Sequence, residues 1–138
     1  RLRRALKNRM WQAKHPERMR EVKNLSYHKS RLAERWRHLV YAAAARSKEK
    51  GWEFSLTGEW ASSRWTGKCE ITGVPFVIAS GQRSLYAPSI DRIDGDKGYT
   101  PDNCRIVIWA FNALKDKHND TDLRKIIKLI ANSDWFNE

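Results

Sequence analysis

The chain has 138 residues, with 27 Lys and Arg against 16 Asp and Glu, a formal net charge of +11 and a pI near 10.0. Its hydrophobic content of 41% argues against a disordered chain, and no apolar run approaches the roughly 20 residues of a membrane-spanning helix, which excludes a membrane protein. The charge is uneven: residues 1–50 carry 16 Lys and Arg against 4 acidic residues (+12), while residues 51–138 carry 11 against 12 (−1). This basic N-terminal part points to a polyanionic partner, with nucleic acid the leading candidate.

The first 50 residues are predicted to be helical. Residues 1–14 form a first helix, Pro16 suits the first turn of a second, and Ser30 caps a third that ends near Gly51. The third helix has the best pattern, because its apolar residues fall on one stripe: Leu32, Trp36, Leu39, Val40 and Ala43.

The remaining residues alternate between short extended segments and helices. Residues 52–56 form a strand or an extended link, and Thr57 opens a helix over 59–65. Residues 68–80 are rich in strand-forming residues around a turn at 72–75, and the extended segment 87–94 leads into a loop over 95–103. A strand over 104–108, a helix over 109–116 and a final helix capped within 119–121 follow.

The chain contains two cysteines, Cys69 and Cys104. Two thiols are too few for a disulfide framework or a four-thiolate zinc site, so a reduced, cytoplasmic setting is expected. The chain opens on Arg1 without a signal peptide, which suggests a fragment or a trimmed chain.

Several separate motifs occur in order between Cys69 and Lys117. The sequence reads C-E-I-T-G-V-P-F, then S-I-D-R-I-D-G-D-K-G-Y-T-P-D-N, then F-N-A-L-K. This arrangement resembles the HNH, or ββα-metal, endonucleases, and most of all a phage and bacterial branch with DRID and KGYT motifs. The resemblance covers at least residues 52–117. It implies an α+β fold with a small ββα-metal core, over about residues 68–117, framed by helices and preceded by a basic helical arm.

The resemblance also implies a metal site. Asp91 and Asn112 match the two ligand positions of the family, and Asn103 matches the central Asn that braces the loop through its backbone. A carboxylate and an amide oxygen suit a hard cation such as Mg²⁺, or Mn²⁺, which holds the scissile phosphate and stabilises the leaving oxygen. The resemblance further implies that hydrolysis leaves 5′-phosphate and 3′-hydroxyl ends.

Arg92 departs from the commonest family pattern, in which a His at this point is the general base. A guanidinium stays protonated at working pH, so Arg92 is expected to clamp the phosphate instead. Another group must then activate water, and the candidates are Tyr86, Asp94, Tyr99, His118 and a metal-bound water. Tyr86 is the first choice, because at least one branch of the fold pairs Asp-Arg with a tyrosine. Activity is favoured over its loss, since both ligand positions are present.

No structural zinc is expected. Many HNH proteins carry two C-x-x-C pairs, but here the corresponding positions are Cys69 with Thr72 and Ile108 with Phe111. Apolar packing is predicted to replace the metal, through Ile108, Phe111, Phe76 and Trp109. Cys104 is predicted to be a buried, inert thiol.

Residues 1–50 are therefore interpreted as a DNA-binding arm and residues 51–138 as an HNH-type nuclease domain. The residues expected to contact phosphates are all basic: Arg3, Arg4, Lys7, Arg9, Lys14, Arg18, Arg20 and Lys23. Alternatively, the arm pairs two copies as a homodimer or lies on a larger partner.

The sequence predicts a metal-dependent endonuclease acting on double-stranded DNA inside a bacterial or phage-infected cell. Homing, restriction, nicking and phage DNA processing are all compatible with it. The rival interpretations are an inactive nucleic-acid-binding module and a DNA-junction binder, each with the same fold.

Overall fold

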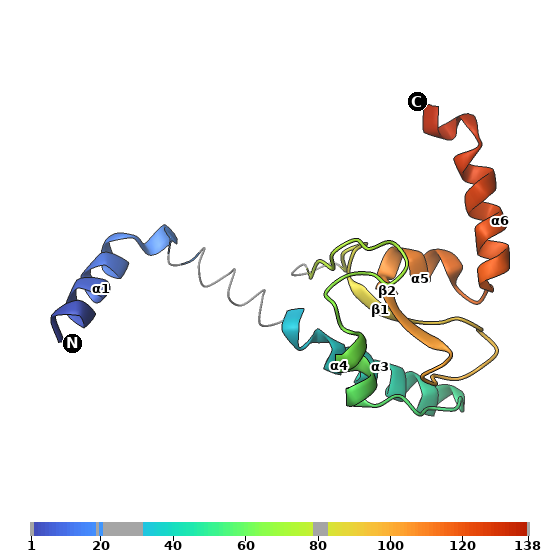
Figure 1. Ribbon diagram of the computed structural model, residues 1–138, viewed down its shortest axis with the longest axis horizontal. Helices are drawn as coiled ribbons and strands as arrows, with labels where there is room; N and C mark the ends of the chain where they lie inside the picture. The colour runs from blue at the N-terminus through green and yellow to red at the C-terminus, as the bar shows by residue number, and fades with distance from the viewer. Residues whose placement is uncertain (1, 19, 21–31, 79–82, 138) are drawn as a thin grey trace. The chain divides into compact units, whose positions relative to one another are not determined.

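The computed structural model describes residues 2–18, 20, 32–78 and 83–137. The chain divides into two units, Arg1–Ala33 and Glu34–Glu138. The first contains helix α1 (Leu2–Lys14), which confirms the predicted first helix (Figure 1). The predicted cap at Ser30 lies outside the described residues.

Helix α3 (Arg35–Lys50) belongs to the second unit, where it packs against α4 (Gly58–Arg64) and β1 (Pro88–Arg92). The sequence division after residue 50 assigned this helix to the arm, whereas its contacts place it with the residues that follow. Helix α3 ends as predicted at Gly51, whose left-handed backbone (φ 68°) lets its N–H reach the carbonyl of Ser47. Helix α4 begins where Thr57 accepts a hydrogen bond from the N–H of Trp60.

The centre of the second unit is a ββα motif. Strands β1 and β2 (Cys104–Ile108) pair antiparallel, with Pro88 opposite Ile108 and Arg92 opposite Cys104. Helix α5 (Trp109–Lys115) follows β2 directly and packs against both strands (Figure 1). Together with α3 and α4, this makes an α+β fold, as predicted.

The loop between the strands is tied to the segment after α3. The N–H of Tyr99 donates to the carbonyl of Glu53 at 2.8 Å, and the N–H of Ser55 donates to the carbonyl of Tyr99 at 2.9 Å. A Cβ at Gly98 would overlap the backbone oxygen of Glu53, so this approach requires glycine. The side chain of Tyr99 is 5% exposed and belongs to a core shared with Ala43, Leu56, Ile90 and Cys104.

Helix α6 (Asp120–Ala131) follows α5, and a short 3-10 helix, η1 (Asp134–Asn137), follows α6. Asn119 caps α6 by accepting a hydrogen bond from the N–H of Asp122, as the sequence predicted. Of the apolar side chains on α6, Leu123 is buried, while Ile126 and Ile127 are exposed. Among the described residues, no helix is long and apolar enough to cross a membrane.

Candidate functional site

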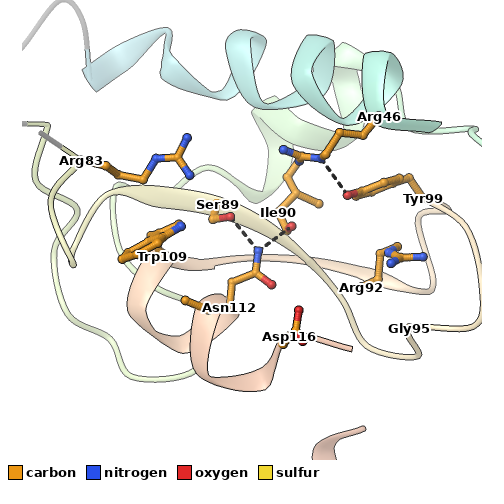
Figure 2. A pocket seen from close by; sticks show the side chains of 11 residues that line it. Arg46, Arg83, Ser89, Ile90, Arg92, Gly95, Tyr99, Trp109, Asn112 and Asp116 are labelled. Atoms are coloured by element: carbon orange, nitrogen blue, oxygen red, sulfur yellow. Dashed lines mark hydrogen bonds between the residues drawn. The ribbon is translucent and has the colours of Figure 1, made fainter. Parts of the chain in front are cut away.

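A pocket of about 260 Å³ lies where α3, β1 and α5 meet (Figure 2). We call it the arginine pocket, after three of the residues that line it. The lining consists of Arg46, Arg83, Ser89, Ile90, Arg92, Gly95, Tyr99, Trp109, Asn112, Ala113 and Asp116. Three guanidinium groups against one carboxylate give this small volume an excess of positive charge, which suits an anionic ligand.

Arg92 enters the pocket from the end of β1. Its Nη1 donates to the carbonyl of Lys97 at 2.9 Å, and its guanidinium lies 3.7 Å from the centroid of the Trp52 ring. A backbone contact and a cation–π stack fix the group without neutralising it. The remaining N–H donors can therefore serve an anion, which is the role the sequence predicted for this residue.

Asn112 enters the same pocket from α5. Its amide nitrogen donates to the hydroxyl of Ser89 at 2.7 Å and to the carbonyl of Ile90 at 3.1 Å. Because both partners are acceptors, the amide nitrogen must face them, and the amide oxygen is therefore turned into the pocket (Figure 2). The structure thus brings Arg92 and Asn112 together.

Asp116 is a pocket residue that the sequence reasoning missed. It follows α5 at a positive φ of 48°, its N–H donates to the carbonyl of Asn112, and its side chain points toward Asn112 (Figure 2). The signal was present in the sequence, because residues four apart on a helix share a face. Asp116 is the only carboxylate among the residues that line the pocket.

Asp91 does not line the pocket. It is 1% exposed, and its two oxygens are held by Arg105 at 2.7 Å and by the ammonium of Lys115 at 3.1 Å. Arg105 also makes a two-pronged ion pair with Asp120, at 2.8 and 2.6 Å. We call these four residues the buried ion cluster.

The cluster changes the acidity of its members. The hydrogen bonds from Arg105 lower the pKa of Asp120 below its ordinary value, although partial burial opposes the shift. Burial lowers the pKa of Arg105, but the hydrogen bonds to Asp120 and Asp91 outweigh this and raise it. Each charge in the cluster thus has an opposite charge beside it.

The two residues of the predicted metal pair have different surroundings, because Asn112 lines the arginine pocket and Asp91 does not. Both oxygens of Asp91 are instead bonded to cations, Arg105 and Lys115. In the part of the chain that the structure describes, no group of three or more His, Cys, Asp or Glu side chains could hold a metal ion. The pocket lining does include two side chains with oxygens of the kind that a hard cation takes, Asn112 and Asp116, four residues apart in the sequence.

Asn103 makes the contacts expected of a loop brace. Its Oδ1 accepts from the N–H of Asp94 at 2.9 Å, while its Nδ2 donates to the carbonyls of Asp94 and Gly98. With its side chain buried, this one amide ties Asp94 and Gly98 together within the loop between the strands.

The candidate bases are scattered. Tyr86, the first choice, lies before β1, is 48% exposed and is not among the pocket residues, whereas Tyr99 lines the pocket. His118 lies in a separate apolar hollow beside α6, and Asp94 is held in the loop by an ion pair with Lys97. Of the four, only Tyr99 lines the pocket with Arg92 and Asn112.

The turn that contains Cys69 and Thr72, two of the positions where many HNH proteins carry zinc-binding cysteines, is held by polar contacts. Glu70 accepts two hydrogen bonds from Arg64 and one from the N–H of Ile106, which ties the turn after Cys69 to β2. Burial and hydrogen bonding act oppositely on Cys69, and the bonds, led by that from Thr72, lower its pKa. These contacts hold the turn after Cys69 against β2.

Cys104 is 1% exposed, and burial raises its pKa to about 12. Its thiol therefore stays protonated at neutral pH, as expected of an inert residue.

The basic residues of the first unit whose side chains are described are all exposed: Lys7, Arg9, Lys14, Arg18 and Arg20. Arg3 and Arg4 lie within α1, and Lys23 lies outside the described residues.

Among known proteins, a similarity was found to a solved structure but not to a sequence family. No protein-family model matches the sequence, and no curated protein matches it. The fold is similar to the solved structure of PacI, a rare-cutting HNH restriction endonuclease described as perturbing DNA. The TM-score is 0.53 at 14% sequence identity, and the similarity covers 69% of this chain and 75% of that chain. The second unit therefore has an HNH-like ββα fold.

Proposed function

We propose that this protein is a divalent-metal-dependent endonuclease that hydrolyses phosphodiester bonds of double-stranded DNA. The observation that carries the proposal is the meeting of Arg92, from the end of β1, and Asn112, from α5, in a pocket with two more arginines and one carboxylate. The HNH-like fold supports it. The sequence resemblance assigned a role in the reaction to both residues.

The three arginines that line the pocket favour an anionic substrate. A guanidinium offers paired N–H donors that match the oxygens of a phosphate, and it stays charged throughout the reaction. Arg92 binds the scissile phosphate and stabilises the negative charge that develops on it. Because Trp52 and the carbonyl of Lys97 already fix Arg92, little reorganisation is needed on binding.

A bound Mg²⁺ or Mn²⁺ would hold the scissile phosphate and stabilise the leaving oxygen. The amide oxygen of Asn112 and the carboxylate of Asp116 would hold the cation, with Ser89 and Ile90 orienting the amide. Asp91 acts at a distance: through Lys115 it anchors α5, which carries Asn112.

Cleavage of supercoiled plasmid tests the proposal. Wild-type protein should nick or linearise the plasmid in Mg²⁺ or Mn²⁺ and stop on chelation, leaving 5′-phosphate and 3′-hydroxyl ends that a ligase can rejoin. Asn112→Ala and Arg92→Gln should each lower the rate about 100-fold or more. The matched control is Asp122→Asn, an exposed acid on α6, which should cut normally.

Two further variants separate the candidate carboxylates. Asp116→Asn should lose cleavage without losing thermal stability, whereas Asp91→Ala should lower the melting temperature. If the Asp91→Ala variant were folded but inactive while Asp116→Asn still cut DNA, the metal ligand would be Asp91 and not Asp116. Cutting retained by both Asn112→Ala and Asp91→Ala, or absent from every form in all metals, would reject the catalytic assignment and leave a DNA-binding module.

The exposed basic residues of the first unit are proposed to add affinity. Replacing Lys7, Arg9, Lys14 and Arg18 together by Gln should weaken binding to any duplex sequence. The slope of log affinity against log salt should fall by roughly 0.9 for each phosphate that the arm no longer neutralises. An unchanged slope would contradict a DNA-binding arm.

A further inference from the structure

We propose that the arginine pocket binds a second backbone phosphate, next to the scissile one, through Arg46, and that Tyr99 is the positioning residue for Arg46. The inference rests on the proposed function for the identity of the polyanion as DNA. It assigns a binding role to a residue of α3, a helix outside the ββα motif.

Tyr99 is a rigid support. Its ring is buried, and its backbone is bonded in both directions to the segment after α3, through Glu53 and Ser55. At Gly98 the loop lies so close to the backbone of Glu53 that a Cβ would overlap its oxygen. The phenol oxygen is therefore held at a fixed place on the wall of the pocket.

Arg46 is attached to this support by one end of its guanidinium. Its Nε donates to the Tyr99 hydroxyl at 3.1 Å, and the guanidinium lies 5.7 Å from the centroid of the ring (Figure 2). Ala43 and Ser47, on either side of it along α3, are buried, so the helix cannot turn this side chain away. With Nε engaged, the two terminal nitrogens remain for a bidentate contact to a phosphate.

The charges around Tyr99 are unbalanced. Arg92 lies 5.4 Å from the same ring centroid, so two cations pack on one tyrosine. Among the described residues, neither has a carboxylate within ion-pair distance. Arg64 and Arg105 of the same unit do have carboxylate partners.

The two unpaired guanidiniums repel each other, and an anion between or beside them would remove that cost. Asp116 is the single acid on the pocket wall and is needed near Asn112. Arg92 and Asn112 define the place of the scissile phosphate. Arg46 reaches the pocket from another element, α3, and is therefore assigned to the neighbouring phosphate of the strand.

The test measures binding of the full chain to a fluorescein-labelled DNA duplex by anisotropy, in EDTA and over a range of salt. Arg46→Gln should weaken binding about five- to tenfold and lower the salt slope by about 0.9, the value for one phosphate contact. The control, Arg37→Gln, removes the same charge from the same helix at an exposed position beside Glu34, outside the pocket. It should change affinity less than twofold.

Tyr99→Phe tests the positioning role. It keeps every charge but removes the hydroxyl that holds Arg46, so binding should weaken about threefold with little change in the salt slope. In the Tyr99→Phe, Arg46→Gln double variant, the loss should equal that of Arg46→Gln alone. Arg46→Lys keeps the charge but lacks the paired N–H donors of a guanidinium. Its salt slope should equal that of the wild type, while its affinity should lie between those of the wild type and Arg46→Gln.

The outcomes separate this inference from the proposed function. Plasmid cleavage by wild type, together with equal binding by Arg46→Gln and Arg37→Gln, would overturn the inference alone. An inactive wild type whose binding still depends on Arg46 would overturn the nuclease and leave the phosphate site standing. Additive losses from Tyr99→Phe and Arg46→Gln would remove the positioning role of Tyr99.

Discussion

Lys115 is the residue whose removal should most damage the second unit. Its side chain is 0% exposed, and its ammonium donates to the carboxylate of Asp91 at 3.1 Å and to the carbonyl of Arg92 at 2.5 Å. The substitution Lys115→Met keeps a similar length and removes only the charge and its bonds. The buried ion cluster then carries one positive and two negative charges instead of two of each.

The expected cost follows from burial. Removing one partner of a buried ion pair leaves an uncompensated charge and costs about 3–5 kcal/mol, against a total stability of roughly 5–15 kcal/mol for a domain. For a unit of this size, the melting temperature should fall by upwards of about 10 °C. Lys125→Met is the matched control, because Lys125 makes a 3.7 Å pair with Asp122 in which both side chains are exposed. It should change stability by less than about 0.5 kcal/mol.

Urea unfolding followed by circular dichroism gives the free energies of wild type, Lys115→Met, Asp91→Asn and the double variant. The double variant removes one charge of each sign and leaves Arg105 paired with Asp120. Its cost should therefore be smaller than the sum of the single costs by about 1–3 kcal/mol. Additive costs, or a Lys115→Met variant as stable as Lys125→Met, would refute the account of the cluster.

Three other outcomes are expected. Gly98→Ala should lower the urea midpoint, because its Cβ meets the backbone oxygen of Glu53; an unchanged midpoint would show that the loop can move. Since the folded pKa of Asp120 lies below its ordinary 3.8, its ion pair with Arg105 stabilises above pH 3.8 and is lost as the pH falls through that lower pKa. The stability gap between wild type and Asp120→Asn should accordingly shrink from pH 6 to below pH 3, and a constant gap would contradict this. Cys104, with a pKa of about 12, should resist iodoacetamide at pH 8 in the folded protein, and rapid labelling found by mass spectrometry would show that it is accessible.

Local sequence signals predicted the framework of the fold well. Gly51, Thr57 and Asn119 mark helix ends through their own backbone or side chain, so each could be identified without knowing what packs nearby. The ββα motif came from motifs that lie close together in the sequence, over residues 87–116. Asn103 could be anticipated for the same reason, because it braces a loop only a few residues away.

Side-chain partners set by pairing across elements were not predictable in this way. Asp91 meets Arg105 because the two residues are opposite each other in the strand register, and it meets Lys115 because α5 folds back on β1. The sequence predicted a metal ligand at Asp91, and only the strand register and the packing of α5 reveal the two cations that bind it. The membership of α3 in the second unit depends likewise on contacts with a strand about 40 residues further along the chain.

Asp91 and Arg92 are adjacent in the sequence, but they have different surroundings in the structure. Neighbouring residues of a strand point to opposite faces, so Asp91 faces the buried ion cluster while Arg92 faces the arginine pocket. The two faces are linked, because Lys115 binds both Asp91 and the carbonyl of Arg92 and belongs to the helix that carries Asn112. One buried lysine thus sets the position of the strand end relative to α5, and with it the distance between the guanidinium of Arg92 and the amide of Asn112. A loss of cleavage in an Asp91 variant therefore identifies a metal ligand only if that variant also keeps the stability of the wild type.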